Sequence, residues 1–318
     1  MRKLHLDTDI GGDIDDLCAL AMALNCLEGE LVAVTTVSDV GGRRAGYARY
    51  VLEIAGRRDV PVAAGADISL GCYQHWQPGF HPDENAYWPE SIQPMPGPSA
   101  EAISLLERSI REGAIIAAAG PYTNLALLER SSPGILATAR LVLTGGFVFP
   151  PRKGFPQWGR EMDYNIQVDP ESARIVLERA NPVLVTLSVT LETALRRCWL
   201  PALREAGPLG QLLARQAEAF AIEEGMESRF GRTCAGLPDD IINFLHDPLA
   251  CAIAVGWSDG VEMREIPLKS EIKDGYLRQT VDANGKLTKV VTRVNGREFG
   301  EFWLRTVCRL QSGCVANE

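Results

Sequence analysis

Five aspartates lie close together near the start of the chain. Residues 7–16 read Asp-Thr-Asp-Ile-Gly-Gly-Asp-Ile-Asp-Asp, directly after a short apolar run and before a helical pattern. One aspartate there would serve as a helix cap, but five exceed that need. Carboxylates this close repel one another and raise each other's pKa unless a cation neutralises them. The segment therefore predicts a site for Ca²⁺ or Mg²⁺, built from oxygen ligands, rather than a solvated acidic turn.

Three other kinds of site could be considered for this acidic segment. An EF-hand loop needs a carboxylate at its twelfth position, and counting from Asp7 that position is Cys18. A zinc site would need histidine or cysteine ligands, which residues 7–16 lack. An aspartyl-phosphate phosphohydrolase also begins with a strand followed by D-x-D. With Asp7 as its nucleophile, this alternative stays open on the segment alone.

Strand-like apolar runs alternate with helical patterns over the first 190 residues. The runs at 3–6, 31–37, 60–65, 114–120, 141–146 and 183–188 predict buried strands. Between them lie helical patterns such as 15–27, where leucines recur every three or four residues. This alternation is typical of a parallel sheet flanked by helices. The acidic segment then follows the carboxyl end of a strand, where such sheets bind ligands.

The remaining chain completes the predicted fold. Residues 190–255 are mainly helical, residues 261–294 carry strand and turn signals, and 299–310 form a closing helix. Ala283-Asn284-Gly285 is the expected hairpin turn. Two irregular loops, 71–98 and 147–164, break the alternation, and long loops inside compact domains are usually functional. We expect an α/β fold with an open, mostly parallel, Rossmann-like sheet and a small β-hairpin region near the C-terminus, in one domain over 1–318.

Composition and charge narrow the classes of partner. The chain has 32 basic and 41 acidic residues, a net charge of −9, which argues against a general nucleic-acid or membrane-surface binder. No apolar run reaches the roughly 20 residues of a membrane span, and no secretory signal is evident. The eight cysteines form no C-x-x-C pair. We expect a reduced, cytoplasmic protein whose partner is a small molecule.

The acidic segment resembles the N-terminal signature D-x-D-P-G-x-D-D of the inosine-uridine-preferring nucleoside hydrolases. Further motifs of that family recur in order along the chain. They are T-T-V-S-D at 35–39, D-V-P-V-A-A-G at 59–65, G-P-Y-T-N-L-A at 120–126, T-G-G at 144–146, D-Y-N-I-Q-V-D-P at 163–170 and H-D-P-L-A at 246–250. Each motif is weak alone, but their order and spacing are specific. The chain is identified as a member of this family.

The resemblance implies a Ca²⁺ site and a reaction. The expected ligands are Asp9, Asp16, the carbonyl oxygen of Thr123, and Asp247, although Asp247 alone would suit a helix cap before Pro248. The reaction is hydrolysis of an N-glycosidic bond through an oxocarbenium-like transition state. Ca²⁺ would position a water, and Asp9 would be its general base. A non-catalytic nucleoside-binding protein on the same fold is the remaining alternative.

The resemblance also assigns substrate contacts. Asp15 and Asp39 are expected on ribose hydroxyls, and Asp163 and Asn165 on the 3′ and 5′ side. Relative to the family's first motif, this chain has two extra residues, which leaves the role of Asp13 open. Members of the family commonly form homodimers or homotetramers, and we expect the same here.

The leaving base needs protonation or stacking. His246 is the expected general acid, with a structural role as the alternative. His81 is a second candidate because the first irregular loop also holds Trp76, Tyr87 and Trp88. These aromatics would either stack on a nucleobase or pack the loop itself. The base-recognition region departs most from the family pattern, so the preferred base stays open.

Overall fold

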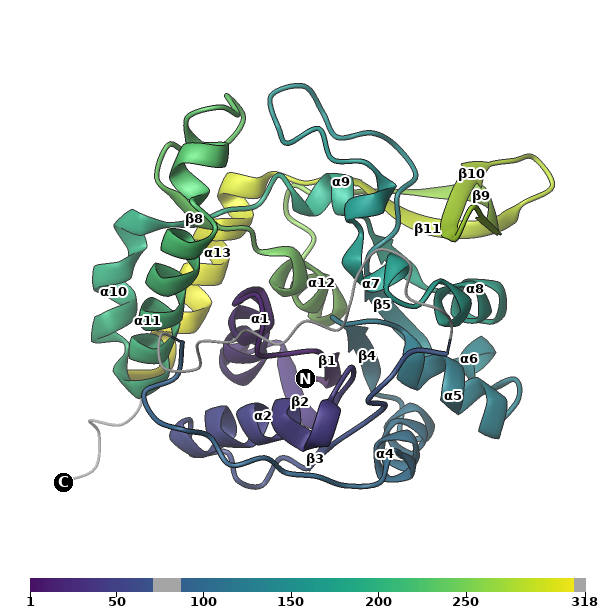
Figure 1. Ribbon diagram of the computed structural model, residues 1–318, viewed down its shortest axis with the longest axis horizontal. Coiled ribbons are helices and arrows are strands. Elements are labelled where there is room, and N and C mark those ends of the chain that lie inside the picture. Colours follow the sequence, from purple (N-terminus) through teal and green to yellow (C-terminus); the bar gives the residue numbers. More distant parts are fainter. Residues whose placement is uncertain (71–86, 312–318) are drawn as a thin grey trace.

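The structure is a computed structural model, and it describes residues 1–70 and 87–311. The strands of these residues form one nine-stranded sheet and one two-stranded sheet (Figure 1). The order in the large sheet is β10-β9-β11-β6-β5-β4-β1-β2-β3. Its strands are β1 (Arg2–Thr8), β2 (Gly29–Thr36), β3 (Val62–Ala63), β4 (Ile115–Ala118), β5 (Arg140–Thr144), β6 (Val183–Val185), β9 (Glu262–Lys273), β10 (Tyr276–Val281) and β11 (Lys286–Arg293).

The first six strands are parallel and confirm the predicted Rossmann-like sheet. Along the chain, pairing runs outward from β1 to β2 and β3, and then returns to β4 on the other side of β1. The strand order therefore reverses between β1 and β4. Open α/β sheets bind their ligands at the carboxyl ends of the strands where the order reverses. The acidic segment leaves β1 at this point.

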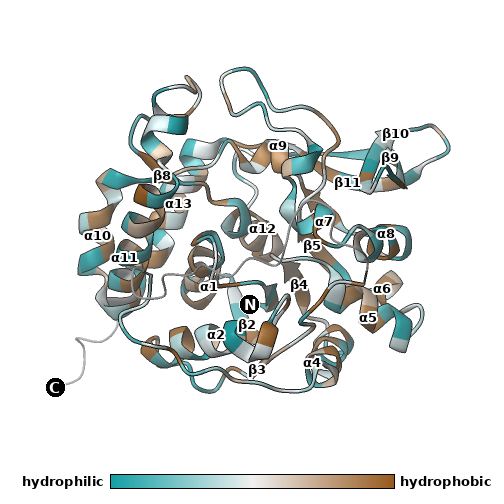
Figure 2. Cartoon of the chain, viewed as in Figure 1, coloured by the Kyte–Doolittle hydropathy of each residue, from teal (hydrophilic) through white to brown (hydrophobic). Residues whose placement is uncertain are grey.

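Helices cover both faces of the sheet. They are α1 (Asp15–Asn25), α2 (Arg43–Ile54), α4 (Ser99–Arg111), α5 (Thr123–Ser131), α8 (Pro170–Arg179), α12 (His246–Val255) and α13 (Gly296–Val307). On β4, Ile115 and Ala117 join one apolar core with α1, α2, α12 and α13, whereas Ile116 and Ala118 join a second core with α4, α5 and α8. Successive strand residues point to opposite faces, which explains the continuous apolar runs in the sequence. Figure 2 shows both hydrophilic and hydrophobic residues on α4 and α8, which have one exposed side, whereas α1 and α12 are buried on nearly all sides.

Antiparallel strands near the C-terminus confirm the predicted hairpin region, but the predicted turn is wrong. Strands β9 and β10 pair through a tight turn at Asp274 and Gly275, whose φ angles of 54° and 81° suit a type I′ turn. Residues 283–285 instead connect β10 to β11, which lie on opposite sides of β9. They cross over the middle of β9 at Pro267 and Leu268, because β10 pairs with the second half of β9 and β11 with the first half. Strand β11 also pairs with β6 and so joins the hairpin to the main sheet.

The segment expected to be mainly helical also contains a small sheet. The helices of this segment are α9 (Leu187–Thr190), α10 (Leu200–Glu205) and α11 (Gly207–Glu223), and the π-helix η4 (Glu227–Gly231) follows them. Between these elements, β7 (Leu195–Arg196) pairs with β8 (Ile241–Asn243). Strand β8 leads directly into α12 and brings Asn243 toward the start of α1.

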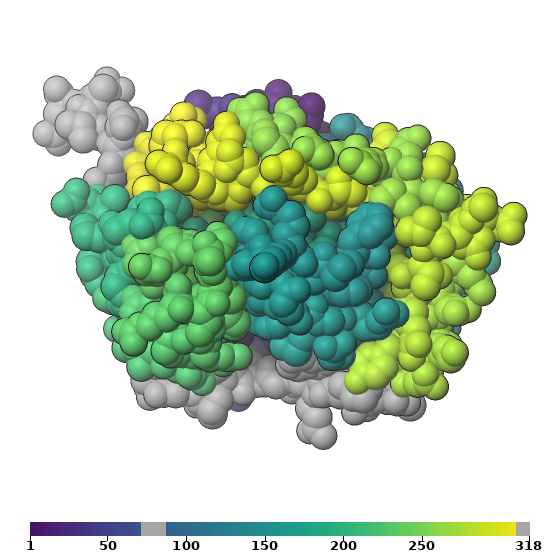
Figure 3. Space-filling model, turned by 90° about the horizontal axis from the view of Figure 1, so that it is seen from above, coloured from purple at the N-terminus to yellow at the C-terminus, as the bar shows by residue number. Residues whose placement is uncertain are grey.

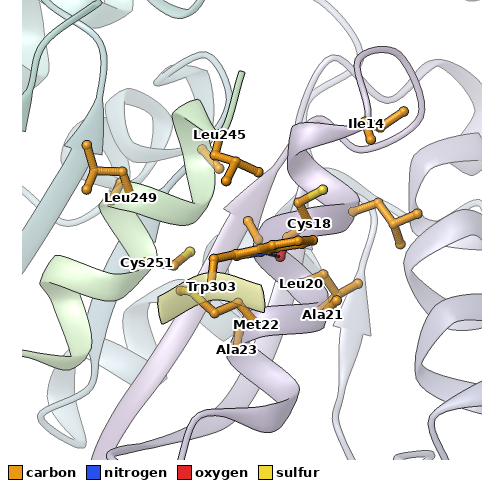
Figure 4. Packing of buried hydrophobic residues seen from close by; sticks show 14 of the residues in the cluster. Ile14, Cys18, Leu20, Ala21, Met22, Ala23, Leu245, Leu249, Cys251 and Trp303 are labelled. Carbon is orange, nitrogen blue, oxygen red and sulfur yellow. Dashed lines mark hydrogen bonds between the residues drawn. The ribbon is translucent and has the colours of Figure 1, made fainter. Parts of the chain in front are cut away.

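Helices α1, α12 and α13 pack together beneath the acidic segment. The indole of Trp303 on α13 lies among residues of α1 and α12, and its Nε1 donates to the carbonyl of Cys18 at 3.0 Å (Figure 4). This core fixes α1 and α12 relative to one another and so aligns their N-termini. Within the described ranges, each helix is too short or too polar to cross a membrane.

Candidate active site

Three buried carboxylates meet at the N-termini of α1 and α12. Asp15 and Asp16 begin α1, and Asp247 lies in the first turn of α12. Carboxylate oxygens of all three lie within 4.8 Å of one another. The positive ends of both helix dipoles favour negative charge here. The predicted ligand set was Asp9, Asp16, the carbonyl of Thr123, and Asp247. The observed cluster contains Asp16 and Asp247 of that set and adds Asp15.

The chemistry of this cluster fits a hard divalent cation. Burial raises the pKa of all three carboxylates well above the ordinary value for aspartate, and the neighbouring carboxylates raise it further. Within the described part of the chain, Oδ1 of Asp247 is buried and has no hydrogen-bond partner. A bound cation would satisfy that oxygen and remove the repulsion. Oxygen ligands alone favour Ca²⁺ or Mg²⁺ over zinc.

Asp9 lies beside the cluster, at the carboxyl end of β1. It lines the same cavity as the three clustered carboxylates. Burial raises its pKa, and the guanidinium of Arg44 opposes that shift. A Cβ at Gly120 would lie 2.8 Å from Oδ1 of Asp9, so only glycine fits in the loop after β4. The close contact between these two loops sets the position of Asp9.

Thr123 and Asp39 have structural partners in the fold. The hydroxyl of Thr123 donates to Asp169 at 2.6 Å, and Thr123 is buried at the start of α5. Both carboxylate oxygens of Asp39 accept backbone N–H groups at the start of α2, from Arg44 at 2.8 Å and Ala45 at 3.0 Å. Neither Thr123 nor Asp39 is among the residues that line the cavity. A carbonyl ligand at Thr123 and a ribose contact at Asp39 stay predictions.

Asp163 and Asn165 line the cavity on the side of β5. Asp163 accepts the N–H of Gly146 at 2.6 Å, and burial raises its pKa to about 7. The amide nitrogen of Asn165 donates to the carbonyls of Ala119 and Thr144 at 3.0 and 3.2 Å. Backbone contacts on both sides hold these two polar groups in place. Their amide and carboxylate oxygens are suited to accept hydrogen bonds from sugar hydroxyls.

His246 lines the cavity next to Asp247, and a hydrogen-bond chain orients its ring. The hydroxyl of Thr190 donates to the carbonyl of Leu187 at 3.0 Å, so it accepts from Nδ1 of His246 at 2.6 Å. This arrangement places the hydrogen on Nδ1 and leaves Nε2 for the substrate. Burial lowers the pKa of His246 to about 4. Its catalytic role as an acid stays a prediction.

The far end of the cavity is aromatic. Trp158, Phe230 and Phe244 line it and contact one another edge to face, with ring centroids 5.3–5.7 Å apart. Phe244 also lies 5.2 Å from the ring of His246. The sequence reasoning missed this group, whose only signal was the irregular loop that holds Trp158. Figure 3 shows the teal segment that follows β5 between the green segment around η4 and the yellow-green β9–β11.

The aromatics proposed from the first loop fall into two groups. Trp76 and His81 lie outside the residues that the structure describes. Tyr87 and Trp88 are buried, and Trp88 stacks on Tyr47 with centroids 4.2 Å apart. For these two, the structure supports the packing alternative over stacking on a nucleobase.

The cavity as a whole has a volume of about 480 Å³ and two chemically different ends. Such a volume suits a small ligand of one sugar and one base. Asp7, the nucleophile of the phosphohydrolase alternative, is fully buried outside it and accepts from Thr35 at 2.6 Å and Asn124 at 2.8 Å. That alternative therefore loses its nucleophile. The lining residues with charged, amide or imidazole side chains are Asp9, Asp13, Asp15, Asp16, Arg44, Asp163, Asn165, Glu224, Arg229, Asn243, His246 and Asp247.

Comparison with known proteins agrees with this geometry. Residues 4–301 match the model of a family described as inosine-uridine preferring nucleoside hydrolase. Pyrimidine-specific ribonucleoside hydrolase RihA of Salmonella arizonae is 30% identical over 300 residues, which are 91% of this chain and 87% of the relative. A purine-preferring ribonucleoside hydrolase from Gardnerella vaginalis superimposes with a TM-score of 0.77 at 23% identity. An inosine-uridine preferring nucleoside hydrolase from Bacillus anthracis gives 0.69 at 20%, and both cover 97% of this chain and 99% of theirs.

Proposed function

The chain belongs to the inosine-uridine preferring nucleoside hydrolase family, whose members are N-glycosidases, and we propose that it hydrolyses a ribonucleoside or related N-riboside with the help of Ca²⁺. The cavity carries this proposal, because one end is a buried carboxylate cluster and the other is aromatic. A nucleoside has the same division between a polar sugar and a flat base. The products would be the free base and ribose.

The carboxylate end stabilises the sugar as the glycosidic bond breaks. Cleavage places positive charge on the ribosyl ring, and preorganised negative groups lower the energy of that state. Asp15 and Asp39 are the proposed partners of ribose hydroxyls, and Asp163 and Asn165 those of the 3′ and 5′ side. The buried setting strengthens these interactions because water does not screen them.

Asp9 is the proposed general base for the attacking water. Its carboxylate lines the cavity beside the cluster, and its contact with Gly120 restricts its movement. Asp9, Asp16, Asp247 and the carbonyl of Thr123 are the proposed Ca²⁺ ligands, with Asp15 beside them. The cation, when bound, would hold vicinal ribose hydroxyls and lower the pKa of a water molecule.

The aromatic end is the proposed place of the leaving base. Stacking on an aromatic ring contributes about 1–3 kcal/mol per base. His246 lies between Asp247 and the aromatic group, with its hydrogen on Nδ1. Its Nε2 would first have to take up a proton before it could transfer that proton to the leaving base. Trp76 and His81 remain proposed contributors from the first loop. Truncating His246 and His81 separately would show which of them assists the leaving group.

The test is chromatography of reactions with a panel of nucleosides, run with Ca²⁺ and with a chelator. We expect free base and ribose with Ca²⁺, and loss of both products when the metal is removed. Asp16→Asn should lose activity at the same Ca²⁺ concentration, whereas Asp59→Asn, an exposed carboxylate outside the cavity, should not. Equal turnover with chelator and with Ca²⁺ would refute the metal dependence, and no turnover across the panel would refute the hydrolase activity on these substrates.

The cellular setting is also a proposal. We propose that the chain works as one domain, in the cytoplasm, and as a homodimer or homotetramer. Six cysteines of the described residues are free thiols, which is compatible with a reducing compartment. Light scattering coupled to size exclusion would measure the oligomeric state.

A further inference from the structure

The extra residues of the first motif place an additional carboxylate in the cavity. Asp13 lies in the connection between β1 and α1, outside the cluster of Asp15, Asp16 and Asp247. It lines the cavity and is partly buried. Its Oδ1 accepts from the amide nitrogen of Asn243 at 2.7 Å and from the backbone N–H of Asp15 at 3.3 Å. Two donors from different elements therefore hold this carboxylate in one position.

Asn243 supplies an independent sign of a missing ligand. It is fully buried on β8 and lines the cavity, and its amide nitrogen is used by Asp13. Within the residues that the structure describes, its Oδ1 is buried and accepts no hydrogen bond. A buried acceptor without a donor costs about 1–3 kcal/mol, so a native structure seldom leaves one unmatched. A substrate N–H group would remove that cost.

Asp13 and Asn243 each adjoin one of the two groups that line the cavity. Asp13 precedes Asp15 of the carboxylate cluster by two residues, and Asn243 directly precedes Phe244 of the aromatic group. The hydrogen bond between them therefore joins the sugar end to the base end. An acceptor here would meet the leaving base where it emerges from the sugar.

We propose that Asp13 and Asn243 form an acceptor pair that selects N-ribosides whose base carries an amino group. This inference rests on the proposed hydrolysis and names the substrate class of the same site. The carboxylate of Asp13 and the carbonyl oxygen of Asn243 both accept, and an exocyclic amino group offers two hydrogens. A base with a carbonyl oxygen in that place would face two acceptors, would form a hydrogen bond with neither, and would leave Oδ1 of Asn243 unpaired.

The test compares substrates that differ only by this group, cytidine with uridine and adenosine with inosine. A hydrogen bond to a charged acceptor changes affinity by about 10- to 100-fold, so the wild-type protein should favour one amino substrate by at least tenfold in kcat/KM. Asp13→Asn presents a donor as well as an acceptor, and it should reduce that preference about tenfold. Glu224→Gln, which removes another carboxylate of the cavity, should keep the wild-type ratio.

Equilibrium binding of the same four nucleosides to the Ca²⁺-loaded protein gives a second readout. If wild type binds an amino nucleoside more tightly than its oxo counterpart, and Asp13→Asn loses this difference in Kd, the acceptor pair is supported. Should no hydrolysis occur in that case, only the proposed function fails. If the ratio of kcat/KM between amino and oxo nucleosides is the same in wild type and Asp13→Asn, the acceptor pair is wrong and the proposed hydrolase activity stands. Circular dichroism would confirm that both variants are folded, and failure of wild type to bind any of the four nucleosides would overturn both.

Discussion

His5 should make the stability of the protein depend on pH in a way that one substitution removes. The imidazole is fully buried on β1, directly under the active-site end of the sheet. Its Nε2 lies 2.9 Å from the hydroxyl of Thr35, which itself donates to Asp7, so Nε2 must carry a hydrogen. Its Nδ1 lies 2.8 Å from the hydroxyl of Ser109 and accepts from it. The fold therefore holds His5 in its neutral form.

The size and sign of the effect follow from the pKa. Burial, together with the charge of Arg108, lowers the pKa of His5 from 6.5 to about 3. Below about pH 6.5 the unfolded chain takes up a proton that the folded protein rejects, so stability falls as the pH falls toward 3. Between about pH 7 and pH 5 this loss amounts to about 2 kcal/mol. For a chain of this length that is about 3 °C in Tm.

The assay is urea unfolding of wild type and His5→Gln, from about pH 7 to pH 5, in one buffer with chelator. Glutamine keeps a donor and an acceptor but does not titrate, so the variant should lose about 2 kcal/mol less than wild type over that range. Ser109→Ala is the matched control, since it removes one partner and keeps the titrating ring. Parallel pH curves for wild type and His5→Gln would refute the assignment of a buried neutral imidazole.

Two further predictions concern the ends of the cavity. Ca²⁺ at about 100 times its Kd should stabilise the protein by about 2.7 kcal/mol, or about 4 °C in calorimetry, and Asp247→Asn should lose most of that shift. An equal shift in both proteins would place the metal elsewhere. Trp158→Ala should lower kcat/KM about 5- to 100-fold through lost stacking, with the Ca²⁺-induced shift in Tm unchanged. Unchanged kcat/KM for every nucleoside would exclude Trp158 from base binding.

The parts of the fold that the sequence predicted share one property, a strong local pattern. Strands β1, β2 and β4 are buried on both faces and therefore appear as apolar runs. Strands β7 and β8 have two and three residues, too few for any periodicity to emerge. Asn284 and Gly285 do lie in a turn, as predicted, but the strands on either side of it, β10 and β11, do not pair with each other. The long strand β9 accepts β10 on one side and β11 on the other.

The same contrast applies to the site. The acidic residues Asp9, Asp15 and Asp16 are neighbours along the chain, so the amino-acid sequence alone indicates their chemistry. The aromatic end brings together Trp158, Phe230 and Phe244 from three distant segments, each of which alone looks like ordinary core. Only the crossing of the loop after β5 over the end of β8 makes them one surface.

The connection between β1 and α1 shows how specificity can change while the metal cluster stays in place. Both ends of this connection are fixed, because Asp9 is held against Gly120 and Asp16 accepts from the hydroxyl of Thr8 at the end of β1. Extra residues between two fixed ends must bulge outward, and here the bulge reaches Asn243. The added Asp13 then alters what the base end accepts without displacing the carboxylates that hold the cation. Substitutions at Asp13 should therefore change substrate preference far more than Ca²⁺ affinity.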